Sequence, residues 1–283
     1  MMAFTRFAKI VPTRGAQSSV LAVMLLCAGA SASAAGELAS AWTASSLSKV
    51  RLIGGGLEKS IWQAGVEISL KGEAHTYWRN PGDGGLPPTF DFSGSKNLKS
   101  YKVAFPAPTR SGDPGSQIFG YKREVIFPLT ITAADPEKPV VLNLHINYAA
   151  CENICLPAEG KVTLELDPRI DGGALKARIS DYQARVPKPL EGPGTPSLTI
   201  SALPGNEKQW RVDVQPALDK DADLFAEGAD GWFFDTKRLP GGSFQLVLAE
   251  KPADAGTKLP PVTLTLTTSK GAFESLRHLD AGP

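Results

Sequence analysis

The chain has 283 residues, and its 30 basic and 29 acidic side chains give a net charge of +1. This balance excludes the strongly basic surface that nucleic-acid-binding proteins use. Glycine (28) and proline (23) are frequent, and the apolar runs are short and separated by turn residues. Because this pattern is typical of β-sandwiches rather than helical bundles, we expect an all-β protein.

The first 35 residues have the features of a secretory signal peptide. Three basic residues precede an apolar run at residues 20–30, which is too short to span a bilayer, and residues 31–35 are small enough for cleavage. Cleavage removes Cys27 and changes the net charge to −2, from 27 basic and 29 acidic residues. We therefore expect a periplasmic protein that is not inserted in the membrane and keeps only Cys151 and Cys155.

Short alternating segments predict a first group of strands. In residues 61–70, for example, Val66, Ile68 and Leu70 alternate with polar residues, as in a half-buried strand. We interpret the three glycines at 54–56 as a turn before this strand. The other strands expected in this group cover residues 49–53, 73–79, 101–105, 121–133, 140–148 and 161–166, with long Pro/Gly-rich loops at 80–94 and 106–120.

The rest of the chain predicts one helix and a second group of strands. Leu175, Ile179 and Tyr182 have helical spacing within residues 171–185. Proline and glycine then mark a linker at 187–196. Further strands are expected at residues 197–202, 209–214, 231–234, 243–248 and 261–268. We therefore predict a signal peptide (1–35), a first β domain (36–186), the linker, and a smaller β domain (197–283).

Three chemical interpretations of Cys151 and Cys155 follow from their position between two predicted strands. A structural disulfide that closes so small a loop would stabilise the fold by only about 2 kcal/mol. A redox couple needs two close sulfurs on a rigid support, and Pro157 would restrict the loop further. The neighbouring Glu152 disfavours a thiolate, and the thioredoxin-type CxxC spacing is absent.

A metal site is the third interpretation, and it would need a further ligand such as His145. This histidine alternates with core-facing residues and shares a polar row with Asn143 and Asn147, so solvent exposure is the better interpretation. After signal cleavage the chain also lacks the methionines that soft copper sites often use. We therefore predict no metal and no cofactor. Motifs for serine hydrolases, zinc proteases, phosphate-binding loops and dinucleotide binding are absent.

The segment NYAACENICLPAEGKVTLEL, with the upstream HTYWRNPGDGGLPPTFDFSGS and GYKREVIFPLTI, resembles the N-terminal periplasmic domain of the disulfide reductase DsbD family. The resemblance covers residues 50–166 and is greatest to the ScsB-type form. It implies an immunoglobulin-like β-sandwich whose cysteine pair carries electrons from a membrane-embedded donor to thioredoxin-like periplasmic proteins. It also implies that partners attack Cys155 and that Cys151 is the resolving thiol.

The same resemblance implies aromatic side chains that shield or support the cysteine pair. Phe119 corresponds in position to the aromatic residue of a cap loop within residues 106–120, and Tyr77 and Trp78 correspond to aromatic residues beside the site. Tyr148 is a further supporting candidate at the end of its strand. Ordinary core packing is the alternative for each of them.

We therefore expect a thiol–disulfide exchange protein with protein-disulfide reductase activity. The alternative is a non-catalytic β-sandwich that handles copper or binds a partner and holds a structural disulfide.

Overall fold

The computed structural model describes residues 38–280 except 114, 171, 206–207 and 257. The predicted signal peptide, including Cys27, lies outside the described residues. Nearly all regular elements in the described part are strands, and none of its helices is long and apolar enough to cross a bilayer. The predicted all-β class with a β-sandwich is confirmed, and the division into two domains stays a prediction. The finer description as immunoglobulin-like stays a prediction.

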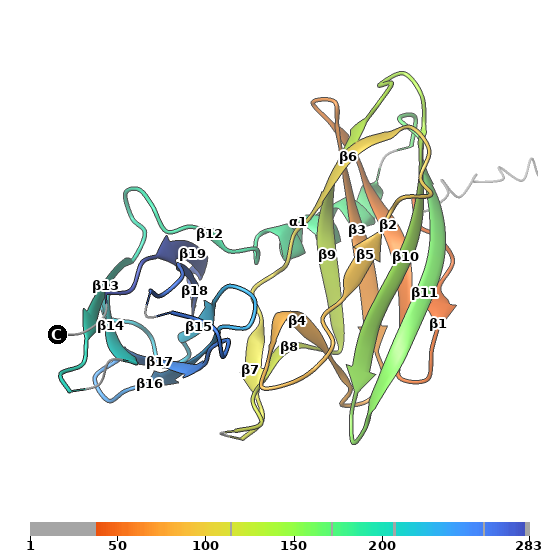
Figure 1. Cartoon of the computed structure of the whole chain (residues 1–283). Coiled ribbons are helices and arrows are strands. Elements are labelled where there is room, and N and C mark those ends of the chain that lie inside the picture. The colour runs from red at the N-terminus through yellow and green to blue at the C-terminus, as the bar shows by residue number, and fades with distance from the viewer. Residues whose placement is uncertain (1–37, 114, 171, 206–207, 257, 281–283) are drawn as a thin grey trace, which may run out of the picture. The chain divides into compact units, whose positions relative to one another are not determined.

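Two sheets face each other in the first sandwich (Figure 1). One has the order β1-β2-β3-β9-β6, and the other has the order β11-β10-β4-β8-β7 with β5 paired to β10. The bounds are β1 Thr43–Ala44, β2 Ser48–Glu58, β3 Ile61–Leu70, β4 His75–Gly82, β5 Thr89–Asp91, β6 Leu98–Val103, β7 Thr109–Ser111, β8 Ile118–Lys122, β9 Glu124–Ala133, β10 Val140–Cys151 and β11 Cys155–Leu166.

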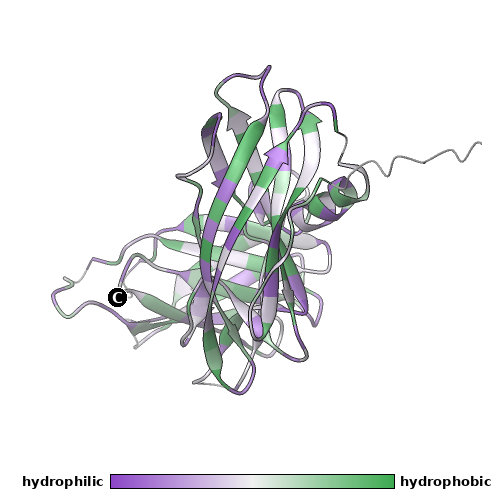
Figure 2. Cartoon of the chain, turned by 90° about the vertical axis from the view of Figure 1, so that its right-hand side faces the viewer, coloured by the Kyte–Doolittle hydropathy of each residue, from purple (hydrophilic) through white to green (hydrophobic). Residues whose placement is uncertain are grey.

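The core of the first sandwich lies between these two sheets. In β10, Leu142, Leu144, Ile146 and Tyr148 are buried, and the residues between them are more exposed. This alternation is the one expected from the sequence, and Figure 2 shows the corresponding change between hydrophobic and hydrophilic segments along the strands. A rigid two-layer support therefore underlies the end of β10, where Cys151 lies.

The predicted glycine turn at 54–56 is wrong, because these residues continue β2 with a bulge between Gly54 and Gly56. The absence of side chains lets other parts of the chain approach this strand closely. An added Cβ on Gly54 would lie 2.3 Å from Cδ2 of Leu38, and one on Gly172 would lie 2.5 Å from the carbonyl carbon of Gly55. The glycines therefore serve packing against the sandwich rather than a change of chain direction.

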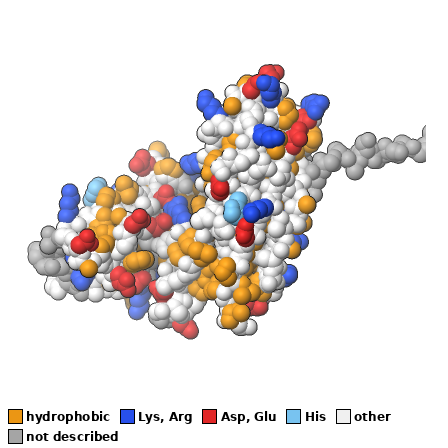
Figure 3. Space-filling model, turned by 45° about the vertical axis from the view of Figure 1, so that its right-hand side comes forward, with side chains coloured by type: hydrophobic (Ala, Val, Ile, Leu, Met, Phe, Trp, Pro, Cys, Tyr) orange, Lys and Arg blue, Asp and Glu red, His pale blue; other side chains and the backbone are white. Residues whose placement is uncertain are grey.

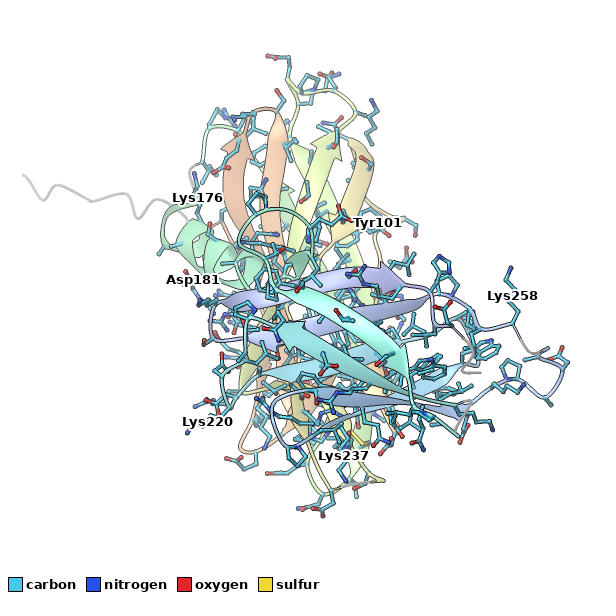
Figure 4. The ribbon with its side chains drawn as sticks, turned by 90° about the vertical axis from the view of Figure 1, so that its left-hand side faces the viewer. Tyr101, Lys176, Asp181, Lys220, Lys237 and Lys258 are labelled. Carbon is cyan, nitrogen blue, oxygen red and sulfur yellow. A yellow bond between two sulfur atoms is a disulfide. The ribbon has the colours of Figure 1, made fainter. Side chains whose placement is uncertain are left out.

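Helix α1 (Gly173–Gln183) confirms the predicted helix. Its buried residues are Leu175, Ile179 and Tyr182, the three that have helical spacing in the sequence. Lys176 and Asp181 project from the helix in Figure 4, and Nζ of Lys176 lies 2.7 Å from Oε1 of Glu58 in β2. One apolar face therefore packs against the sandwich, and the opposite face is solvated.

The second group of strands forms two four-stranded sheets around a separate cluster that includes Trp210. Their orders are β12-β19-β18-β15 and β13-β14-β17-β16. The predicted linker contributes β12, which pairs in parallel with β19. The bounds are β12 Lys188–Pro189, β13 Ser197–Ala202, β14 Gln209–Gln215, β15 Asp223–Glu227, β16 Phe233–Arg238, β17 Phe244–Glu250, β18 Val262–Thr268 and β19 Gly271–Arg277.

Candidate functional site

The two cysteines close the β10–β11 hairpin. Cys151 and Cys155 form the last register pair of the two strands, and a disulfide joins them with their Cα atoms 4.0 Å apart. The bond appears in yellow in Figure 4. Cys151 is 1% exposed, whereas Cys155 is exposed. The two cysteines therefore differ in exposure although they share one bond.

Strand pairing places two further residues in line with the cysteine pair across the sheet. Cys151 in β10 pairs with His75 in β4, and His75 pairs with Lys122 in β8. Directly opposed residues of antiparallel strands place their side chains on the same face. Because the neighbouring Ala150 packs in the sandwich core, Cys155, Cys151, His75 and Lys122 form a row on the outer face of the sheet.

Tyr77 fills the next row and contacts both sulfurs. Its hydroxyl lies 3.1 Å from Sγ of Cys151 and 3.2 Å from Sγ of Cys155. The residues beside it are small: Ala149 belongs to the same apolar cluster, and Gly120 is its register partner in β8. An added Cβ on Gly120 would lie 2.1 Å from the carbonyl oxygen of Thr76. The local sequence therefore requires glycine beside the tyrosine.

The ring of Tyr77 is covered by a loop from the long Pro/Gly segment. An added Cβ on Gly85 would lie 2.3 Å from Cε1 of Tyr77, so the loop backbone lies directly against the ring. Ile118, partly buried, packs against the cluster of Tyr77, Ala149 and Cys151. The sulfur of Cys151 is therefore enclosed, and the hydroxyl of Tyr77 is held toward the disulfide.

Exposed apolar side chains lie next to this enclosed site. Ile154, in the turn between the two cysteines, is 67% exposed, and Leu86 follows the glycine that covers Tyr77 and is also exposed. Figure 3 shows apolar side chains gathered at the lower end of the first sandwich, the end that carries the tip of the β10–β11 hairpin in Figure 1. Exposed Cys155 therefore has apolar side chains near it on the surface.

Burial sets the protonation of the groups around the sulfurs. It raises the pKa of Tyr77, so the phenol stays a hydrogen-bond donor at neutral pH. The pKa of His75 is lowered by burial and, to a lesser extent, by the positive charge of Lys122. The Glu152 carboxylate accepts a hydrogen bond from the backbone N–H of Glu73 at 3.3 Å.

Residues 58–167 match the family model for the N-terminal part of thiol:disulfide interchange protein DsbD. The chain contains a DsbD N-terminal-like domain. A solved structure, the N-terminal periplasmic domain of ScsB from Proteus mirabilis, is 17% identical to this chain with a TM-score of 0.66. The match covers 87% of this chain and 100% of that chain, and it shows a shared fold. A search of curated proteins found no match.

The predicted resemblance to this family is therefore confirmed, and the DsbD N-terminal-like domain contains the whole β10–β11 hairpin with its disulfide. The family and the disulfide together fit a thiol–disulfide exchange domain.

The aromatic candidates of the DsbD N-terminal-like domain occupy different faces of its sheet. Tyr77 contacts the disulfide on the outer face. Trp78 and Tyr148 are buried in the core, where the Tyr148 hydroxyl lies 2.8 Å from Oγ of Ser48. Phe119 also belongs to the core cluster, with its ring centroid 4.9 Å from that of Phe225. Of these four, Tyr77 is the one with a contact to sulfur.

Sequence reasoning missed the cover by Ile118 and the position of His75. A signal for His75 was available, because it precedes Tyr77 by two residues and therefore shares its face in a strand. His145, the metal ligand considered from sequence, lies on the outer face of β10 with Nε2 2.8 Å from Oε1 of Glu159. Within the described residues, no group of three or more His, Cys, Asp or Glu side chains is arranged to hold a metal ion.

Proposed function

We propose that this protein is a periplasmic thiol–disulfide exchange protein that passes reducing equivalents between thioredoxin-like partners through Cys151 and Cys155. The observation that carries the proposal is the unequal exposure of the two cysteines that share one disulfide at the end of a sheet. A partner thiolate can approach Cys155, while Cys151 stays enclosed beneath Tyr77. This asymmetry supports Cys155 as the exchanging sulfur and Cys151 as the resolving one.

The exchange needs no cofactor. In the reduced protein, the Cys155 thiolate attacks a partner disulfide, forms a mixed disulfide and releases the partner's second thiol. The Cys151 thiolate then attacks Sγ of Cys155, and the bond between Cys155 and the partner breaks. Two electrons have passed to the partner, which leaves as a dithiol. The reverse sequence recharges the protein from a donor, for which we propose a membrane-embedded protein or its thioredoxin-like domain.

The surface around the disulfide supports an apolar partner contact. Thiol exchange requires the partner sulfur to approach along the S–S bond, which brings the two protein surfaces together. Ile154 and Leu86 are exposed apolar side chains next to this approach. We propose that they contact the partner, and that Tyr77 and Ile118 shield Cys151 from small thiols and oxidants between encounters. The periplasmic location is supported by the signal-like N-terminal sequence and by the periplasmic domain of similar fold.

Trapping tests the proposal directly. In the mature chain, Cys151→Ala removes the resolving thiol, so mixed disulfides between Cys155 and periplasmic thioredoxin-like proteins should accumulate and disappear on reduction. Cys155→Ala is the matched control, and its buried remaining thiol should form few adducts. If neither variant forms adducts while a known relay protein does in the same extract, the exchange role is wrong.

The reduction potential separates an exchange couple from a structural bridge. Structural disulfides have potentials below about −300 mV. We expect a higher potential for Cys151–Cys155, measured by equilibration with glutathione or dithiothreitol buffers. A value below that limit would support the alternative of a β-sandwich with an inert disulfide.

A further inference from the structure

We propose that His75 accepts the proton of the Cys151 thiol when this buried residue resolves a mixed disulfide. The inference deepens the proposed exchange function and rests on it. It assigns a proton-transfer role to a side chain that lies 76 positions before Cys151 in the sequence and meets it through strand pairing.

Register brings the two residues together. Cys151 and His75 are directly opposed partners of β10 and β4, and such partners have Cβ atoms about 4.5–5.5 Å apart on one face of the sheet. The imidazole also packs edge-on against Tyr77, with ring centroids 5.3 Å apart, and the hydroxyl of Tyr77 contacts Sγ of Cys151. His75 therefore contacts Tyr77 and is the direct strand partner of Cys151.

One ring nitrogen of the imidazole has no hydrogen-bond partner in the described part of the chain. Nε2 of His75 is buried and has no hydrogen-bond partner among the described residues. An unpaired buried nitrogen costs free energy, and such orphaned groups are rare unless they have a role. In the oxidised protein Sγ of Cys151 carries no proton. After reduction it carries one, on the residue that is the direct strand partner of His75.

The charged and titratable neighbours leave His75 as the proton acceptor. From β8, Lys122 is a cation and has no lone pair to offer. On the same strand, Tyr77 is a donor whose pKa is raised by burial, and it stabilises the thiolate without taking the proton. From the hairpin turn, Glu152 accepts the backbone N–H of Glu73. A lowered pKa keeps His75 neutral near pH 7, in the form that can accept.

The proposed step conserves protons and electrons. The S–H bond of Cys151 breaks and its proton moves to the imidazole of His75, while the freed electron pair attacks Sγ of Cys155. The new Cys151–Cys155 bond forms as the bond from Cys155 to the partner breaks, and the partner thiolate leaves with the bonding pair. The imidazolium then returns its proton to that thiolate or to solvent. Because Cys151 is 1% exposed, bulk water is a poor substitute for this acceptor.

Stopped-flow oxidation of the reduced mature chain by dithiobis(nitrobenzoic acid) tests the role. The first release of coloured thiolate reports attack by Cys155, and the second reports resolution by Cys151. We expect His75→Gln to leave the first phase unchanged and to slow the second at least about tenfold near neutral pH, because the variant lacks the general base. The difference should vanish at alkaline pH, where Cys151 ionises without help. His145→Gln is the matched control, since that imidazole pairs with Glu159 on the same sheet.

The pH profile separates proton transfer from a purely structural role, which would slow the second phase at every pH. A second phase that is identical in His75→Gln and the unaltered chain over the whole range would overturn the proposal. The small reagent needs no thioredoxin-like partner, so a failure of the proposed exchange partners leaves this result unaffected.

A measurement on the unaltered residue keeps the test valid if His75→Gln does not fold. In the reduced chain, the Hε1 resonance of His75 should show a second inflection at the pKa of the Cys151 thiol, because a thiolate opposite the ring changes its field. The inflection should be lost in Cys151→Ala and kept in Cys155→Ala. An unchanged His75 titration in Cys151→Ala would also overturn the proposal.

Discussion

The hydroxyl of Tyr77 lies 3.1 Å from Sγ of Cys151, so a neutral donor is directed at the sulfur of the buried cysteine. A hydrogen bond to a charged group is worth about 1.5–3 kcal/mol, and it acts here on the thiolate that forms when the disulfide opens. The geometry therefore makes Tyr77 an electrostatic support for the resolving sulfur as well as its cover.

Tyr77→Phe should raise the pKa of the Cys151 thiol by about one to two units, because the thiolate loses its donor. Thiolate absorbance against pH in the reduced Cys155→Ala background measures this pKa. Tyr101→Phe is the matched control, since that exposed hydroxyl lies 3.5 Å from the carbonyl oxygen of Phe90. An unchanged thiol pKa in Tyr77→Phe would show that the contact does not persist in the reduced protein.

Two adjacent glycines provide a test of the cover over Tyr77. Gly85→Ala places a methyl group against the ring and occupies a backbone conformation with φ of +139°, so it should lower the free energy of unfolding by about 1–3 kcal/mol. It should also speed reduction of the disulfide by dithiothreitol, because the displaced ring uncovers the sulfurs. Gly84→Ala meets open space and should change stability by less than about 0.5 kcal/mol. Equal effects of the two variants in urea unfolding would contradict the close packing of the loop.

The core face and the outer face of the sheet that carries the disulfide show what the sequence could and could not predict. Alternation in β10 and the spacing of Leu175, Ile179 and Tyr182 predicted the strand and the helix, and counting cysteines isolated the pair. Neighbouring residues of a strand point to opposite faces of the sheet. An error of one residue in the predicted position therefore places a core side chain on the face of the disulfide, or the reverse. Ile118 faces the disulfide cluster while Phe119 lies in the core, and no local pattern distinguishes the two.

Long-range register was also outside the reach of the sequence. The pairing of His75 with Cys151 depends on which strands become neighbours in the sheet, and the glycines at 54–56 depend on packing by Leu38 and the start of α1. Both are consequences of the assembled sandwich rather than of local propensity.

Acid should destabilise the oxidised protein partly through His75. Its pKa is lowered in the folded state from the ordinary 6.5, first by burial and then by Lys122. The folded state therefore binds this proton less readily than the unfolded chain, so the stability from neutral His75 is present above about pH 6.5 and is lost as pH falls below it. His75→Gln should flatten the fall in unfolding free energy between neutral and mildly acidic pH. If the slopes with and without the substitution coincide, the imidazole is not buried as described.

Ile154 tests whether the apolar surface beside the disulfide binds partners. The side chain is 67% exposed at the tip of the hairpin, so Ile154→Ser should change stability by less than about 0.5 kcal/mol. Truncation of an apolar side chain at the centre of an interface lowers the binding free energy by more than about 1 kcal/mol. We therefore expect kcat/KM for a thioredoxin-like partner to fall at least about fivefold. Reaction with a small disulfide should be unaffected, because a small molecule needs only the sulfur. Leu276→Ser is the matched control, since that side chain is 62% exposed in β19 and lies outside the cysteine hairpin. A similar loss of kcat/KM in both variants, or in neither, would remove the case for an apolar partner contact at Ile154.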